Sequence, residues 1–226
     1  MSPLLAPIIP APRAVIFDLD GTLGDTFSLV VQAFNDGARD LTGRDYNTDE
    51  VIAMFGIPDS EMIRNELLRL GKSEREAVAA VDRYHEAYET KHRMARVFDG
   101  VTPVLHALRD RGMPMGVMTG KGRRSADITV RAFGWNGLFG AVITGDDVVN
   151  QKPAPDGVFE VARLLKVEPT HCVFVGDSPA DINAGKAAGM KTIVAGWHPV
   201  YLEQLKPLKP ERWANKPADL LRMVLS

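Results

Sequence analysis

The sequence predicts an α/β protein built on a doubly wound parallel sheet, with an all-helical domain inserted near its start. From Arg13 onward, short apolar runs that end in Gly, Asp or Thr alternate with longer amphipathic stretches. This is the pattern of strands buried on both faces by crossover helices. Residues 26–94 interrupt the alternation with helical patterns alone. At 226 residues, the chain has room for one core domain and one sizeable insertion.

Five segments are expected to form the strands of the sheet. Each is short, is partly β-branched and ends in a residue typical of turns or strand ends. They are AVIFD (14–18), MPMGVMTG (113–120), AVITG (141–145), CVFVGD (172–177) and KTIVAG (191–196). In an open sheet of this kind, ligands bind outside the carboxyl ends of the strands.

Residues 26–94 contain four helical patterns in series. The first has apolar residues at helical spacing from Phe27 onward, and the third runs from Pro58 to Leu70. The second and fourth begin with the capping-box pairs Asn47–Glu50 and Ser73–Glu76, in which each side chain bonds the backbone amide of the other residue. The four helices are expected to form a small domain that lies over the end of the first strand.

These patterns divide the chain into a tail, a core and a cap. Residues 1–12 are apolar, contain four prolines and have no Lys or Arg, which predicts a loose tail and not a signal peptide or a membrane span. Residues 13–24 and 95–226 are assigned to the α/β core, and residues 25–94 to the helical cap.

The composition excludes several classes of partner. The formal net charge of -2 gives no overall attraction to nucleic acid or to an anionic membrane. Cys172 is the single cysteine of the chain, so no intrachain disulfide is possible, and its apolar neighbours predict a buried thiol. We therefore expect a cytoplasmic protein with no nucleic-acid or membrane partner, in which any anionic ligand is held by a local site.

Carboxylates follow two of the predicted strands. Asp18 and Asp20 lie two residues apart, so in a strand they point to the same side of the chain. Asp177 ends another predicted strand, and Asp181 lies four residues later in the first turn of a helix. Like charges this close repel strongly where water is scarce, so a shared proton or a cation must compensate.

The second acidic pair favours a cation, and oxygen ligands without His or Cys suit Mg2+. Lys152 follows the predicted strand 141–145 by a short loop, and Thr119 ends another strand with the amide of Gly120 beside it. A cation, an ammonium group, a hydroxyl and an amide around one carboxylate nucleophile are the groups that phosphoryl transfer needs.

Each of these features also has a structural explanation on its own. Asp20 followed by Gly21 is typical of a turn, and Asp177 and Asp181 are typical of a helix N-terminus. Lys152, which precedes a proline, is typical of an exposed loop. Their common position after predicted strands, which brings them to one edge of a sheet, favours a functional site.

The same residues resemble the four motifs of the haloacid dehalogenase superfamily, in their usual order. The matching segments are DLDGTL (18–23), Thr119 after an apolar strand, Lys152 in KPAPD, and GDSPAD (176–181). The resemblance covers nearly the whole chain after residue 12, and it implies a Rossmann-like core with a helical cap inserted after the first motif. Within the superfamily, the segments LGDT (23–26), FDGVTPVL (98–105), TGKGRRSADI (119–128) and TGDDV (144–148) look most like those of phosphoglycolate phosphatases and related small phosphatases.

The resemblance implies a role for each site residue. Asp18 would attack the substrate phosphorus and form an aspartyl phosphate, and Asp20 would act as general acid and then general base. Mg2+ would be held by the Asp18 carboxylate, the main-chain carbonyl of Asp20 and Asp177, with support from Asp181. Three further groups, Thr119, the Gly120 amide and Lys152, would hold the phosphoryl oxygens. Asp20 also distinguishes this chain from true dehalogenases, which lack a second acid and need no metal.

The substrate is expected to be a small phosphorylated metabolite such as 2-phosphoglycolate. The segment from Thr26 to Met94 carries 9 basic and 13 acidic residues, a net charge of -4, and offers no broad attraction for a polyanion. A sugar phosphomutase must grip two phosphates, yet the loop FGIPDSE (55–61) has no basic residue. A phosphatase is therefore favoured, as a monomer or homodimer. The alternative is a phosphomutase of the β-phosphoglucomutase type, and a third hypothesis is a non-catalytic binding protein on the same fold.

Other residues near the predicted site are interpreted as structural. Arg64, Lys121 and Arg123 are expected to be exposed charges on a helix or loop. Trp197 and His198 lie in VAGWHPVYLEQL, which departs from the family pattern of a Gly-Tyr or similar pair after the last core strand. Trp197 is expected to pack under a loop and His198 to be partly exposed, and neither is assigned to the site.

Overall fold

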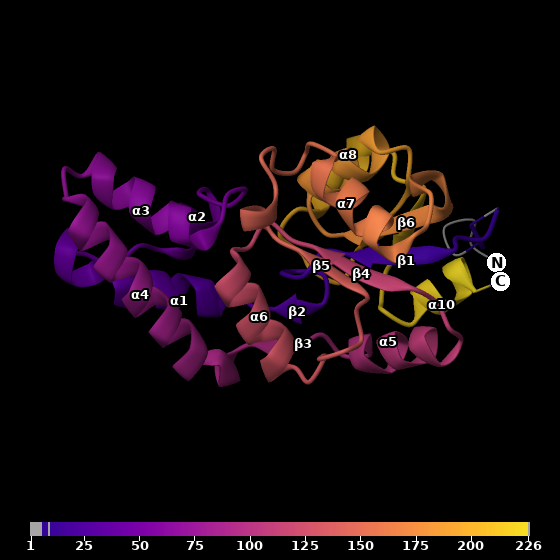
Figure 1. Cartoon of the computed structure of the whole chain (residues 1–226), viewed down its shortest axis with the longest axis horizontal. Coiled ribbons are helices and arrows are strands. Elements are labelled where there is room, and N and C mark those ends of the chain that lie inside the picture. Colours follow the sequence, from indigo (N-terminus) through magenta and orange to yellow (C-terminus); the bar gives the residue numbers. More distant parts are fainter. Residues whose placement is uncertain (1–5, 9, 226) are drawn as a thin grey trace.

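The structure, a computed structural model, describes residues 6–8 and 10–225 of the chain. In that part, six strands form one parallel sheet in the order β5-β4-β1-β6-β7-β8 (Figure 1). Their bounds are Ala14–Phe17 (β1), Met115–Met118 (β4), Ala141–Ile143 (β5), Cys172–Gly176 (β6), Lys191–Ala195 (β7) and Arg212–Ala214 (β8). The five predicted strands all form, and β8 is an addition that the sequence did not predict.

Helices cover both faces of the sheet, and the central strands β1, β4 and β6 are buried along their whole length. Val15 and Phe17 of β1 pack in one buried cluster with helices α5, α6 and α10, whereas Ala14 and Ile16 face a second cluster with α7 and α8. The alternation of side chains along β1 thus divides the core into two layers. Figure 1 shows α7 and α8 on one side of the sheet and α5 and α10 on the other. The helices are α5 (Val101–Asp110), α6 (Arg123–Ala132), α7 (Asp156–Leu165), α8 (Pro179–Ala187), α9 (Leu202–Leu205) and α10 (Asp219–Val224).

The insertion after β1 is helical, as predicted. Within residues 26–94, all of which the structure describes, the α-helices are α1 (Phe27–Thr42), α2 (Thr48–Ile52), α3 (Asp59–Arg69) and α4 (Glu74–Thr90). Both predicted capping boxes, Asn47 with Glu50 and Ser73 with Glu76, are present. The four helices share a buried apolar cluster of their own, which supports our proposal that residues 25–94 form a cap domain.

Two short strands connect the cap to the core. The strand β2 (Gly24–Asp25) pairs antiparallel with β3 (Arg96–Val97), and an ion pair of 3.4 Å joins Asp25 to Arg96. A two-residue strand carries too little apolar pattern to be predicted from sequence. The chain therefore enters and leaves the cap through one narrow ribbon.

The cap also packs against the core beside α6. The hydroxyl of Tyr88 in α4 lies 2.9 Å from the Thr129 hydroxyl of α6, and Ile128 of α6 belongs to the apolar cluster of the cap. Figure 1 shows α4 and α6 lying next to each other. Single-turn 3-10 helices occur at His92–Met94, Gly145–Asp147, Pro169–His171 and Lys206–Leu208.

The structure differs from the expected loose tail at residues 6–8. Ile8 is 1% exposed and belongs to the main core cluster, and its amide donates to the carbonyl of Met223 at 2.9 Å. The Arg212 guanidinium donates to the carbonyls of Ala6 and Pro7, both at 2.9 Å. Burial of an apolar side chain and these hydrogen bonds together hold the segment in place. The remainder of the expected tail up to residue 5, and residue 9, lie outside the described residues.

Among the described residues, no helix is both long enough and apolar enough to cross a membrane.

Candidate active site

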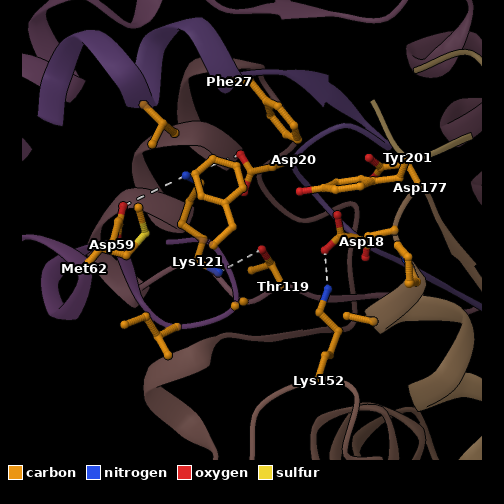
Figure 2. A pocket seen from close by; sticks show the side chains of 18 of the residues that line it. Asp18, Asp20, Phe27, Asp59, Met62, Thr119, Lys121, Lys152, Asp177 and Tyr201 are labelled. Carbon is orange, nitrogen blue, oxygen red and sulfur yellow. Dashed lines mark hydrogen bonds and ion pairs between the residues drawn. The ribbon is translucent and has the colours of Figure 1, made fainter. Parts of the chain in front are cut away.

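A cavity of about 320 Å³ lies at the carboxyl edge of the sheet. The strands β1, β4 and β6 are parallel neighbours, so the residues that follow them meet at this edge. The cap helices α1 and α3 and the loop between α2 and α3 close the opposite side (Figure 2). The charged and hydroxyl residues that line the cavity are Asp18, Asp20, Asp59, Thr119, Lys121, Lys152, Asp177, Ser178 and Tyr201.

Three carboxylates converge at the core side of this cavity. One oxygen from each of Asp18, Asp177 and Asp181 lies within 4.8 Å of the others, and all three side chains are buried. Burial raises the pKa of Asp18 well above its ordinary value, and although Lys152 opposes this shift, Asp181 and Asp177 add to it. The cluster therefore needs positive charge before all three groups ionise.

Lys152 supplies part of that charge. Its ammonium group donates to Asp18 Oδ1 and to Asp181 Oδ1, both at 2.6 Å, and Figure 2 shows it pointing at Asp18. Burial by itself would lower the pKa of Lys152, but the two carboxylates outweigh it and raise the pKa above its ordinary value. Lys152 is therefore charged, and with only 9% of its side chain exposed it is not an exposed loop lysine.

Asp177 keeps one oxygen without a hydrogen-bond partner. Its Oδ1 accepts from the Thr22 hydroxyl at 2.8 Å, whereas its buried Oδ2 has no hydrogen bond among the described residues. The imidazole Nδ1 of His198 lies 3.4 Å from this oxygen. Burial raises the pKa of Asp177, an effect that His198 and Thr22 reduce. A buried carboxylate oxygen without a donor, beside two further carboxylates, fits a divalent cation.

Asp181 accepts hydrogen bonds from Lys152 and also from Ser178, the residue that caps α8. Its Oδ2 accepts from the Ser178 hydroxyl at 2.6 Å and from the Ser178 amide at 2.9 Å. Both oxygens of Asp181 thus have donors already. This residue is therefore better suited to support the site through Lys152 than to contact a cation directly.

Asp20 lies on the same side of β1 but faces the cap. The Thr26 hydroxyl donates to Asp20 Oδ1, and the ammonium of Lys121 lies 3.3 Å from the same oxygen. The carboxylate of Asp20 therefore lies outside the cluster of Asp18, Asp177 and Asp181.

The expectation that Lys121 is an exposed charge is wrong. Its side chain is only 4% exposed, and its ammonium lies between Asp20, Asp59 at 4.0 Å and the ring of Tyr88 at 4.7 Å. Burial would lower the pKa of Lys121, but Asp20, Tyr88 and Asp59 outweigh it and raise the pKa. One indication was present in the sequence, because Lys121 follows Thr119 by two residues and so lies at the same strand end. The other two basic residues interpreted as surface charges are at least one-third exposed and ion-paired, Arg64 with Glu74 and Arg123 with Asp147.

Asp59 is a second residue that the sequence did not assign to the site. It opens α3 of the cap and is 4% exposed. Its Oδ1 accepts from the amide of Gly122 at 3.1 Å, and its Oδ2 accepts from the Tyr84 hydroxyl at 2.7 Å. Asp59 therefore fastens the cap to the loop that follows β4 (Figure 2).

Thr119 and Gly120 line the cavity as predicted. Thr119 is 1% exposed, and its hydroxyl accepts from the amide of Lys121 at 3.2 Å, so its own hydrogen is directed elsewhere. Nothing lies within 4 Å of a Cβ placed on Gly120, which leaves the surroundings of this residue open to a ligand.

The segment after β7 contributes more than expected. Tyr201 lines the cavity, and Figure 2 shows its hydroxyl pointing between Asp18 and Asp20. Burial, together with Asp177, raises the pKa of Tyr201. His198 is buried and stacks edge-on against Phe27 at 4.6 Å between ring centroids, and Trp197 donates to the carbonyl of Thr22 at 3.0 Å. Trp197 packs around the first loop, as predicted, but the expectation that His198 is partly exposed is wrong, because it is only 7% exposed.

A buried acid cluster and two buried lysines at the carboxyl edge of a parallel sheet form the kind of site that enzymes use on phosphate esters. The comparisons with known proteins agree. The family model of the haloacid dehalogenase-like hydrolases matches residues 15–195. The putative pyrophosphatase PpaX of Caldanaerobacter subterraneus is 31% identical over 212 residues, which make up 93% of this chain and 94% of that protein.

Solved structures share the fold. A predicted phosphoglycolate phosphatase from Haemophilus somnus has a TM-score of 0.79 at 22% identity, over 95% of this chain and 99% of that one. A β-phosphoglucomutase from Clostridium difficile has a TM-score of 0.77 at 23% identity, over 92% and 93% of the two chains.

The chain belongs to the haloacid dehalogenase-like hydrolases. It is a phosphoric ester hydrolase of that family, as the sequence motifs predicted.

Proposed function

We propose that the protein is a Mg2+-dependent phosphatase that hydrolyses a small phosphate monoester through an aspartyl phosphate on Asp18. The observation that carries this proposal is the convergence of Asp18, Asp177 and Asp181 within 4.8 Å beside Lys152, with Asp20 on the cap side. A carboxylate nucleophile, a cation site and a separate acid are the groups that this two-step chemistry requires.

Asp18 is the nucleophile in this proposal because it lies between the cation site and Lys152. Its hydrogen bond with Lys152 fixes the orientation of the carboxylate, which would approach the phosphorus from the floor of the cavity. Lys152, the Thr119 hydroxyl and the Gly120 amide would bind the oxygens of the transferring phosphoryl group and stabilise the charge that develops there.

Asp20 acts as the acid and then the base. Thr26 and Lys121 hold its carboxylate toward the cap, where the leaving alkoxide would lie. In the first step Asp20 would protonate that alkoxide, and in the second it would accept a proton from the water that attacks the phosphorus of the aspartyl phosphate.

Asp18 and Asp177 would hold Mg2+, together with the main-chain carbonyl of Asp20, and Asp181 would support them through Lys152. When bound, the cation would offset the repulsion between the carboxylates and the phosphate oxygens. We further propose a cytoplasmic enzyme, monomeric or homodimeric, whose partner is a small phosphorylated metabolite. The buried single cysteine, Cys172, is in keeping with a reducing compartment.

The test of this proposal is phosphate release from a panel of phosphoesters with and without Mg2+. The panel includes 2-phosphoglycolate, which the sequence motifs suggest, and pyrophosphate, after the name of the PpaX relative. We expect release from at least one monoester in the presence of Mg2+ and a loss of roughly 100-fold or more after chelation. The absence of release from every ester would overturn the proposal. A phosphomutase would instead convert glucose 1-phosphate to its 6-phosphate faster than it releases phosphate.

Gly21 offers a sharp test of the cation site. Its φ is +84°, and a Cβ on it would lie 2.2 Å from Asp177 Oδ2. Gly43 has a similar φ of +71°, with nothing within 4 Å of a Cβ, so both alanine variants carry a backbone strain of about 1–2 kcal/mol. Gly21→Ala also displaces Asp177, and we expect it to weaken Mg2+ binding roughly ten-fold in calorimetric titration. Gly43→Ala is the matched control, and equal affinities in the two variants would remove Asp177 from the site.

A further inference from the structure

The cap side of the cavity is apolar. The residues that line it are Phe27 and Val30 of α1, Phe55 and Ile57 of the loop between α2 and α3, and Met62 of α3. Phe27 and Phe55 contact each other edge to face, with ring centroids 5.2 Å apart. In the proposed mechanism the phosphoryl group lies against the core, so this apolar wall faces the organic part of the substrate.

The cations of the cavity are already paired. Among the described lining residues the only basic side chains are Lys121 and Lys152. Lys152 is bonded to Asp18 and Asp181, and Lys121 lies between Asp20 and Asp59. A second anionic group on the substrate would therefore find no cation of its own on the cap side.

The charged residue that the cap does contribute is acidic. Asp59 lines the cavity, and its two oxygens are held by Gly122 and Tyr84. A carboxylate or a second phosphate placed near the cap would lose its hydration and lie close to this like charge. The cap side thus selects against anions as well as offering apolar contact.

We propose that the substrate is the phosphate monoester of an uncharged, largely apolar alcohol small enough for this cavity. The inference rests on the proposed phosphatase function and narrows it. Each methylene that moves from water to the apolar wall favours the transition state by roughly three- to ten-fold. Esters whose alcohol part carries a carboxylate or a phosphate are disfavoured, and 2-phosphoglycolate is one of them.

The test compares two esters of the same shape. In isobutyl phosphate a neutral CH(CH3)2 group replaces the carboxylate of 2-phosphoglycolate, so the pair differs in charge and hardly in size. With the wild-type enzyme and Mg2+, we expect kcat/KM for isobutyl phosphate to exceed that for 2-phosphoglycolate by roughly ten-fold or more. Benzyl phosphate, with more apolar surface, is expected to be a better substrate still.

A lysine on the apolar wall should weaken this preference. Ile57 lines the cavity and is only partly buried, so Ile57→Lys brings an ammonium group to the cap side without opening the core. We expect the ratio of kcat/KM for 2-phosphoglycolate to that for isobutyl phosphate to rise roughly five-fold or more. Val78→Lys is the control, because Val78 is 51% exposed and lies outside the cavity lining; it should leave the ratio unchanged.

The outcomes separate this inference from the proposed function. Faster hydrolysis of 2-phosphoglycolate or pyrophosphate than of isobutyl phosphate would overturn the apolar-substrate inference and leave the phosphatase standing. No Mg2+-dependent release from any of the esters would overturn both. If Ile57→Lys fails to fold, as circular dichroism would show, the wild-type ratio decides alone.

Discussion

Asp18→Asn is expected to lower kcat for phosphate release by roughly 1,000-fold or more, with the best substrate of the panel and saturating Mg2+. An amide is a very poor nucleophile toward phosphorus and forms no aspartyl phosphate. Single-turnover measurement with a 32P-labelled ester followed by acid quenching checks the result directly, because the wild type should retain label on the protein and the variant should not.

The variant should remain folded. Burial and the neighbouring carboxylates make a charged Asp18 unfavourable without metal, and Lys152 keeps Asp181 as a partner. The neutral amide therefore removes repulsion, and urea unfolding without metal should show no loss of stability. Asp110→Asn, at a position that is 63% exposed, is the control for activity. Turnover by Asp18→Asn at the wild-type rate would exclude the aspartyl-phosphate mechanism. If the wild type shows no turnover and Asp18→Asn binds a ligand as tightly as the wild type does, the result would favour a binding protein.

Lys121→Met is expected to lower the free energy of unfolding by about 3–5 kcal/mol, because it leaves the carboxylates of Asp20 and Asp59 without their shared cation. Asp59 is almost fully buried, so water replaces the lysine poorly. Equilibrium urea unfolding measures the loss. Activity should fall in the same variant, because Lys121 helps to orient Asp20.

Arg64→Met is the matched control for that change. Arg64 pairs with Glu74 at 2.6 Å, but both side chains are about half exposed, so its removal should cost about 0–1 kcal/mol. In a second test, the double variant Asp59→Asn with Lys121→Met should be more stable than Lys121→Met alone. The reason is that Asp59 then no longer places an unpaired carboxylate beside the missing lysine. Equal effects of Lys121→Met and Arg64→Met would mean that the buried pair contributes no more than a surface one.

The contribution of Lys121 has a defined pH dependence. Its carboxylate partners raise its pKa above the ordinary value of 10.5. Because the pKa of Lys121 is higher in the folded state than in the unfolded state, its charge stabilises the fold in full at every pH below the unfolded-state pKa. This stabilisation is lost only as the pH rises through the folded-state pKa. The difference in stability between the wild type and Lys121→Met should therefore stay constant from about pH 6 to about pH 9.

The core of the site could be predicted from sequence because parallel strands bring distant residues to one edge. Asp18, Thr119 and Asp177 each follow an apolar run, and the sheet order β4-β1-β6 makes their strands neighbours. The local pattern that identifies a buried strand is thus enough to place the residue after it. The assigned chemical roles of these residues stay predictions.

The cap side could not be predicted in the same way. Asp59 contacts Gly122, 63 residues away in the sequence, and this contact depends on how the cap packs on the core. Lys121 is buried by contacts with Tyr88 and Asp59 of the cap. Because both residues are distant in the sequence, the residues next to Lys121 look like those of an exposed lysine. Tyr201 was missed because its segment matches no motif. Local patterns carry no information about such packing between domains.

The ribbon formed by β2 and β3 is a point at which the cap, and with it the substrate specificity, can be exchanged. Since Gly24 and Val97 are directly opposite each other, the two ends of the cap meet at adjacent positions on the core. A cap of different length or sequence can be joined at this point while β1 and the loop that carries Asp18 keep their geometry. Grafting and recombination at this junction would exchange the part that selects the alcohol and retain the part that breaks the phosphate ester.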